Sequence, residues 1–283
     1  MAIDGIISAI ASLDWDRVEQ TPRGEVYEVC NADEEDWKLF LDSEAPETEC
    51  GKMELIEGKI VIVEFPSVER GAFMGAFSRF LTHDAVIDTY MRPRPAVRTQ
   101  NYEADLSFAP TPQTGAALPR GLRWTQWHTL RIEIGYSRGW GHRRGQLDWK
   151  ANRWATIPGV NYVICVAVED GLASATYKLY RVPRQNDRLH DQDPISIEAP
   201  RTTVILDSQV LLGMSPRARL PTQPPVPARL AIDLYATLDG KLQSAISRRW
   251  TTSKKEHAFL RVAAEALRLD KPVSTLGLAI AHK

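Results

Sequence analysis

The chain has 283 residues, a formal net charge of −1, 43% hydrophobic residues and 25% charged residues. This length and composition are typical of a folded globular protein with one large domain, or one domain and an appendage. The net charge excludes a uniformly basic protein that coats nucleic acid. Residues 120–153 are nevertheless rich in Arg and Lys, so a local basic surface is compatible with the sequence.

Cysteines and apolar runs place further bounds on the class of protein. Cys30, Cys50 and Cys165 are scattered and lack CxxC spacing, which favours neither a disulfide framework nor a zinc site. The N-terminus has no basic segment followed by a long apolar core, and no apolar run approaches ~20 residues. We therefore expect an intracellular protein, cytoplasmic or nuclear, without a signal peptide or a transmembrane segment.

The first part of the chain predicts an extension, a hairpin and a helix. Residues 1–24 are expected to form an N-terminal extension. Residues 53–65, MELIEGKIVIVEF, contain two β-rich runs joined by a Glu-Gly turn, which predicts a β-hairpin that carries Glu54. Residues 67–90 have apolar side chains at mostly helical spacing and predict a core helix.

Two predicted strands each present one carboxylate. Apolar and polar residues alternate in residues 103–108, which places Asp105 on a polar face. The same alternation in residues 129–135, TLRIEIG, places Glu133 on the face opposite the Leu and Ile side chains. Each carboxylate is thus expected on the polar side of an otherwise ordinary strand.

A basic helix and an apolar strand follow Glu133. Residues 141–156 predict a helix with a buried apolar stripe at i, i+4 and i+7, and Lys150 lies on the adjoining face. Residues 160–168, VNYVICVAV, predict a central strand, and residues 175–182 predict its antiparallel neighbour. This strand-helix-strand order is typical of an α/β sheet.

The C-terminal part differs in composition from the rest of the chain. Residues 216–228 are rich in proline and predict a linker. Residues 229–283 predict a helical C-terminal appendage, in which a first helix covers about 228–247 and a second begins at Ser253 and ends before Pro272. These helices are expected to pack on the domain or on a partner copy.

Carboxylates on two strands with a lysine nearby could hold a hard divalent cation and position a water molecule. The alternative is that Asp105 and Glu133 are solvated carboxylates at strand edges, as in many domains of this size. The residues alone leave both readings open.

Four short motifs, in order, distinguish these readings: MELIEGKIV, EADLSF, LRIEIGYS and LDWKANRWATIPGVNYVICV. Their order and spacing resemble the PD-(D/E)XK superfamily of restriction-endonuclease-like nucleases, and within it the Uma-type restriction endonuclease family. The resemblance covers about residues 25–215. It implies an α/β domain with a restriction-endonuclease-like mixed β-sheet core flanked by helices.

The resemblance also implies a metal site. Carried over by position, Asp105 and Glu133 would ligate Mg²⁺, for which Mn²⁺ could substitute, and the backbone carbonyl of Ile134 could add a ligand. Glu54, from the hairpin motif, could complete the acidic cluster. Phosphodiester hydrolysis needs such a metal to neutralise developing charge and to lower the pKa of a bound water.

The catalytic lysine is expected on the basic helix. The superfamily's lysine normally follows the Glu by two residues, and that position is Gly135 here. The Uma-type pattern moves it to the next helix, which points to Lys150. The same pattern has a tyrosine where this chain has Trp154. A lysine beside the metal could orient or deprotonate the attacking water.

The implied function is metal-dependent endonucleolytic cleavage of DNA, with RNA as the less favoured substrate. A catalytically inactive protein of the same fold that binds nucleic acid or a protein partner is one alternative, and a domesticated scaffold that assembles through its tail is another. A homodimer is compatible with cleavage of both strands of a duplex. Four arginines flank the site and either engage phosphates or form a solvated face: Arg131, Arg143, Arg144 and Arg153.

Overall fold

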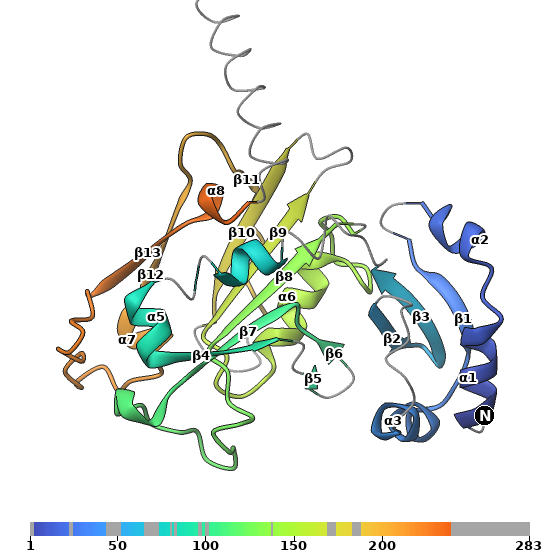
Figure 1. The fold of residues 1–283 in the computed structure, drawn as a ribbon, viewed down its shortest axis with the longest axis horizontal. Coiled ribbons are helices and arrows are strands. Elements are labelled where there is room, and N and C mark those ends of the chain that lie inside the picture. The colour runs from blue at the N-terminus through green and yellow to red at the C-terminus, as the bar shows by residue number, and fades with distance from the viewer. Residues whose placement is uncertain are drawn as a thin grey trace, which may run out of the picture.

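The centre of the structure, a computed structural model, is a six-stranded mixed β-sheet with the strand order β11-β10-β9-β8-β7-β4 (Figure 1). The structure describes residues 3–22, 25–43, 52–64, 74–79, 81, 84–95, 98–99, 102–136, 138–168, 174–182 and 188–238. The sheet strands are β4 (Met91–Pro95), β7 (Leu106–Pro110), β8 (Leu130–Gly135), β9 (Tyr162–Val168), β10 (Ala175–Arg181) and β11 (Ile195–Ser196). Strands β8 and β9 are parallel, and the other neighbours are antiparallel. The predicted α/β class, with a mixed sheet flanked by helices, is confirmed.

Both faces of β8 are covered. Leu130, Ile132 and Ile134 pack into the larger apolar core, together with α5 (Ala85–Tyr90). The opposite face packs against α6 (Leu147–Ala155), which forms the crossover from β8 to β9. The predicted stripe of α6 is buried, and consists of Leu147, Ala151 and Trp154.

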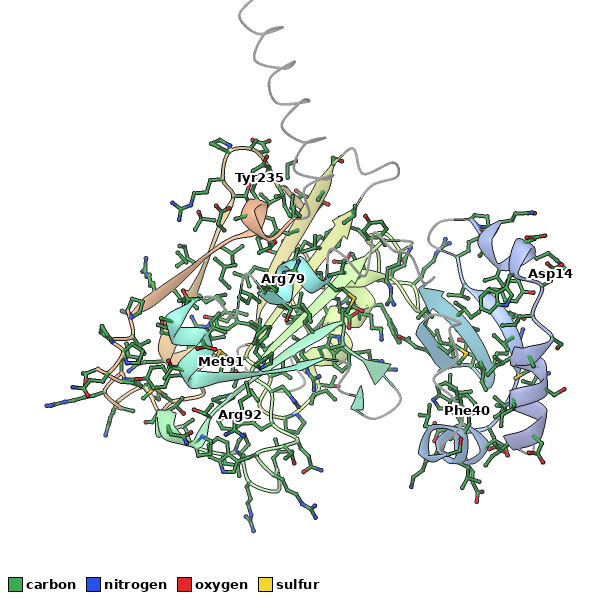
Figure 2. The ribbon with its side chains drawn as sticks, in the orientation of Figure 1. Asp14, Phe40, Arg79, Met91, Arg92 and Tyr235 are labelled. Atoms are coloured by element: carbon green, nitrogen blue, oxygen red, sulfur yellow. The ribbon has the colours of Figure 1, made fainter. Side chains whose placement is uncertain are left out.

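The edge strand β4 contacts the core at its first residue. Met91 is buried in the apolar core, and the next residue, Arg92, is exposed (Figure 2). Two short strands precede β7, namely β5 (Arg98–Thr99) and β6 (Tyr102–Glu103), and the short 3-10 helix η1 (Pro112–Thr114) follows it. The predicted core helix at 67–90 lies partly outside the described residues, but its Phe77, Leu81 and Val86 are buried in the same core.

The N-terminal part forms a unit with its own apolar core. A three-stranded antiparallel sheet has the order β1-β3-β2, and its buried residues, including Ile60 and Ile62, share one cluster with Ile6, Ile10 and Trp37. Figure 1 shows this unit on the α6 side of the central sheet. Its elements are α1 (Ile3–Ala11), α2 (Trp15–Glu19), β1 (Tyr27–Asn31), α3 (Glu34–Asp42), β2 (Lys52–Ile56) and β3 (Lys59–Glu64).

The predicted hairpin is present as β2 and β3. Its turn residues Glu57 and Gly58 have φ angles of 53° and 75°. Two positive φ angles in succession are the requirement of the type I′ turn, which fits the twist of two-residue hairpins. The pairing continues from Ile56 opposite Lys59 to Lys52 opposite Glu64.

The C-terminal part of the described chain is a second hairpin. It consists of β12 (Thr203–Asp207), α7 (Ser208–Leu211), β13 (Arg229–Asp233) and α8 (Leu234–Thr237). The prediction of a helix from about residue 228 is wrong at its start, because β13 pairs with β12 and buries Leu230 and Ile232 at a spacing of two. The remainder of the predicted appendage, 239–283, lies outside the described residues. In the part of the chain that the structure describes, no helix is long and apolar enough to cross a membrane.

Candidate active site

Four separate segments supply the predicted site residues Glu54, Asp105, Glu133 and Lys150. Glu54 comes from β2, Asp105 from the bend between β6 and β7, Glu133 from β8 and Lys150 from α6. Their exposed fractions are 0%, 3%, 0% and 0%, respectively. As predicted, Glu133 faces away from the Leu and Ile side chains of β8, but α6 covers that face. The prediction of a strand at Asp105 is wrong, because the chain bends there.

The ammonium group of Lys150 forms an ion pair with Oε1 of Glu54. Both side chains are buried, so this pair compensates charge in a region with little solvent. A second ion pair is exposed and joins the β2–β3 turn to the loop before α6, where Nη1 of Arg144 is 3.3 Å from Oε1 of Glu57. The β2–β3 hairpin is thus held to the α6 region by one buried and one exposed pair.

Trp154 connects Glu133 with two cations. Its indole Nε1 donates a hydrogen bond of 2.7 Å to Oε1 of Glu133. The ammonium nitrogen of Lys150 lies 5.4 Å from the indole ring centroid, and the guanidinium carbon of Arg131 lies 4.9 Å from it. Because α6 runs back over β8, Lys150 and Glu133 meet at the same indole. We call Glu54, Asp105, Arg131, Glu133, Lys150 and Trp154 the Trp154 network.

Asp105 lies against the backbone of β8. Its Oδ2 accepts a hydrogen bond of 2.6 Å from the backbone N–H of Ile134, the residue after Glu133. Both carboxylates also act on the thiol of Cys165, which is paired with Glu133 in register on β9. Burial raises the pKa of Cys165 well above its ordinary value, and the negative charges of Glu133, Asp148 and Asp105 raise this pKa further. Leu106 pairs with Ile132 in the antiparallel register of β7 and β8, so the adjacent residues Asp105 and Glu133 both project to the other side of the sheet.

Arg131 is an internal cation rather than a surface residue. It is fully buried, donates a hydrogen bond of 2.6 Å to Oγ of Ser107, and lies 3.3 Å from Nδ1 of His128. Burial lowers its pKa to about 10, and the nearby carboxylate of Glu133 acts in the opposite direction. The expectation that Arg131 engages phosphates at the surface does not fit this position. Its guanidinium lies inside the protein, where the charge of Glu133 acts on it.

The other three arginines of the predicted basic surface are exposed: Arg143, Arg144 and Arg153. The guanidinium carbon of Arg153 lies 5.2 Å from the ring centroid of Trp149 on the same helix. Helix α6 begins at Leu147, later than the predicted 141, so Arg143 and Arg144 lie on the preceding loop.

Gly135 cannot carry the lysine of the superfamily pattern. A Cβ atom at this position would lie 2.4 Å from the backbone oxygen of Arg138 and 2.9 Å from its Cγ. Real Cβ atoms do not approach backbone atoms so closely, so any side chain here would displace the loop that follows β8. A lysine for this site has to come from another element, and α6 supplies Lys150.

A second buried cluster on α6 is absent from the sequence-based expectations. The carboxylate of Asp148 accepts hydrogen bonds from Lys178 Nζ at 2.7 Å, from Tyr180 OH at 2.5 Å and from the backbone N–H of Gly141 at 2.7 Å. We call this cluster the Asp148 network. The only signal for it in the sequence is a lysine at the centre of the otherwise β-rich run 175–182.

The described residues do not form a metal site with three or more side-chain ligands. Among the described residues, no group of three or more His, Cys, Asp or Glu side chains is arranged to hold a metal ion. Asp105 and Glu133 remain as a pair on one side of β8. A pair is the number that Mg²⁺ commonly uses, since it retains several waters and binds through one or two carboxylates and substrate phosphates.

No family model and no curated protein matches this chain. Among solved structures it is similar to a protein from Anabaena variabilis ATCC 29413, whose crystal structure is described as that of "a putative nuclease belonging to DUF820". The TM-score is 0.38 and the sequence identity 16%, over 61% of this chain and 89% of that chain. At this TM-score the likeness carries no functional argument, and the function has to be inferred from the site itself.

Proposed function

We propose that the chain is a metal-dependent nuclease that hydrolyses phosphodiester bonds of DNA at the Trp154 network. The observation that supports this most is the convergence of Glu54, Asp105, Glu133 and Lys150 from four separate segments on one side of the sheet. The order of hairpin, Asp segment, Glu strand, lysine helix and apolar strand also follows the restriction-endonuclease-like pattern. The steric exclusion of a side chain at Gly135 gives the helix-borne lysine a physical reason.

Asp105, Glu133 and the backbone carbonyl of Ile134 would hold Mg²⁺, and Mn²⁺ could replace it. The network brings together the carboxyl groups of Glu54, Asp105 and Glu133, and the buried cations near them are Arg131, Arg138 and Lys150. Carboxylate oxygens are ligands that Mg²⁺ binds in proteins. When bound, the metal would neutralise charge on the phosphate and lower the pKa of a bound water.

Substrate access requires a change in the arrangement described above. The network is buried, so we infer that the β2–β3 hairpin moves away from α6 and separates Glu54 from Lys150. The N-terminal unit has its own apolar core, which allows it to move as a body. Lys150 would then be able to orient the attacking water, and the exposed Arg143 and Arg153 would bind backbone phosphates.

The burial of the network favours a second candidate function. Glu133 accepts a hydrogen bond from Trp154, and Lys150 is paired with Glu54, so both charges have internal partners. A catalytically inactive nuclease-fold protein could retain such pairs as part of its core. It would bind nucleic acid or a protein partner through its exposed arginines.

Nicking of supercoiled plasmid DNA in the presence of Mg²⁺ or Mn²⁺ tests the proposal. We expect Glu133→Gln to abolish cleavage and Lys150→Met to slow it by about 10²–10⁴-fold, the usual contribution of a positioned acid-base group. The matched controls are Glu28→Gln and Lys59→Met, which remove an exposed ion pair of 2.7 Å and should leave cleavage unchanged.

Three results would count against the nuclease proposal. Equal cleavage by the parent, Glu133→Gln and Lys150→Met would mean a contaminating activity or another site. Binding of DNA by the parent without metal-dependent cleavage would establish the inactive candidate. A parent protein that neither binds nor cleaves DNA would exclude DNA as the partner.

A further inference from the structure

We propose that Trp154 is the positioning residue of the candidate active site. Its indole N–H fixes the carboxylate of Glu133 for metal binding, and its ring face holds the ammonium group of Lys150. This inference rests on the proposed function and deepens it, because it names a residue that acts through both of the charged groups assigned there.

One fully buried side chain makes these contacts. Trp154 has no exposed surface, and its Nε1 donates to Oε1 of Glu133 at 2.7 Å. The nitrogen of Lys150 is 5.4 Å from the ring centroid, within the range of a cation–π interaction. The guanidinium of Arg131 is 4.9 Å from the same centroid. Trp154 therefore contacts a predicted metal ligand, the predicted catalytic lysine and the buried guanidinium of Arg131 at once.

The position of the indole is well determined by packing. Leu147, Ala151 and Ala155 pack α6 onto Val163 and Cys165 of β9 and leave the helix little freedom to rotate. An indole has only two side-chain torsions, so a buried tryptophan on such a helix presents its N–H in one direction. The hydrogen bond then fixes the orientation of the Glu133 carboxylate relative to β8.

The acceptor of the indole N–H distinguishes a positioning role from a tryptophan that only fills the core. A buried indole N–H needs an acceptor, and a backbone carbonyl would satisfy it equally well. Here the acceptor is a carboxylate on the strand that carries the predicted metal ligand. Groups that hydrogen-bond to metal-binding carboxylates orient them and tune the metal affinity.

Trp154→Phe separates the two roles, because phenylalanine retains an aromatic ring and removes the N–H. We expect Mn²⁺ binding, measured by isothermal titration calorimetry, to weaken on the order of tenfold, the lower end of the range for such orienting partners. The kcat for plasmid nicking should fall while KM for DNA changes little. Trp149→Phe is the matched control, since Trp149 lies on the same helix but packs with Arg153. It should leave the Mn²⁺ affinity unchanged.

A spectroscopic readout tests the contact without metal or activity. In metal-free, ¹⁵N-labelled protein, the indole resonance that disappears in Trp154→Phe belongs to Trp154, and we expect it to shift in Glu133→Gln. An unshifted resonance, or equal Mn²⁺ affinity of Trp154→Phe and the parent, overturns the positioning role alone. A parent protein that binds no Mn²⁺ and cleaves no DNA overturns this role together with the proposed function.

Discussion

Helix α6 carries two buried charged networks that begin only two residues apart, at Asp148 and at Lys150, and they differ in composition. In the Asp148 network one carboxylate accepts hydrogen bonds from an ammonium, a phenol and a backbone N–H, and its charge is balanced by Lys178. In the Trp154 network three carboxyl groups, Glu54, Asp105 and Glu133, face two cations, Arg131 and Lys150.

The difference shows why burial of charged residues does not by itself identify an active site. The Asp148 network joins the loop at Gly141, α6 and β10, and its donors match its acceptors, as expected of a structural cluster. The Trp154 network joins α6 and β8 to the N-terminal unit, which has its own apolar core. A charged cluster at a junction between two units becomes accessible to a substrate when the units separate.

A large effect on stability, equal to that expected for Lys150→Met, comes from breaking the Asp148 network. Asp148→Asn keeps the shape of the side chain and leaves the buried Lys178 without its charged partner. We expect a loss of about 3–5 kcal/mol in the free energy of unfolding, measured by urea denaturation. Asp191, at 3.6 Å from Lys178, is exposed and compensates little. A loss below about 1 kcal/mol would contradict the structural role of this network.

A smaller effect is expected when one donor is removed from Asp148. Tyr180→Phe deletes the phenol that donates to this carboxylate, and we expect a loss of about 1.5–3 kcal/mol, the range for a hydrogen bond to a charged group. Burial and the bond to Asp148 raise the pKa of Tyr180. The folded chain thus keeps a proton that the unfolded chain releases above its ordinary tyrosine pKa of 10.0.

Stability of the parent should consequently fall as the pH rises above this value, and more steeply than that of Tyr180→Phe. Urea denaturation of both proteins between pH 8 and about 10.5 measures the difference. Parallel pH profiles would show that the phenol is not held by Asp148.

Removing both charges of the Glu54–Lys150 pair should change stability least. The double variant Glu54→Gln, Lys150→Met leaves no buried charge without a partner, so we expect unfolding free energies within about 1 kcal/mol of the parent. Lys150→Met alone should be destabilised by about 3–5 kcal/mol. In contrast to its stability, the double variant should lose plasmid nicking. Nicking at the parent rate would remove Lys150 from the proposed mechanism.

The smallest expected effect is that of the Cys165 thiol, on which charges of both networks act. Because its pKa is raised, the thiol keeps its proton in the folded chain above pH 9.0, the ordinary pKa of a cysteine. In the unfolded chain the thiol ionises as the pH rises through 9.0, and this ionisation lowers the stability of the folded state. In a Cys30→Ala, Cys50→Ala variant we expect a thiol reagent to label Cys165 at pH 9 only after addition of denaturant. Rapid labelling of the folded protein would show that this side of the sheet is open to solvent.

The sequence predicts much of the fold because the period of its apolar residues is clear in the central elements. The alternation in 129–135 and the spacing of Leu147, Ala151 and Trp154 identify β8 and the buried face of α6. The segment Arg229–Asp233 is too short for this method, because two apolar residues at a spacing of two do not exclude a helix.

Part of the site could not be predicted, because it depends on long-range packing. An alternating strand shows that Glu133 and Leu130 face opposite ways, but not whether the polar face meets water or a helix. The pair of Asp148 and Lys178 joins residues 30 positions apart and depends on strand register. The contact between Trp154 and Glu133 likewise appears only when α6 is placed over β8.

Anomalous diffraction from crystals soaked in Mn²⁺ tests the central claim most directly. We predict one strong peak at coordination distance, about 2.0–2.3 Å, from carboxylate oxygens of both Asp105 and Glu133. The peak should be absent from Glu133→Gln and present in Asp148→Asn. No peak at these residues in the parent, or an equal peak in Glu133→Gln, would show that the Trp154 network is a structural core and not a metal site.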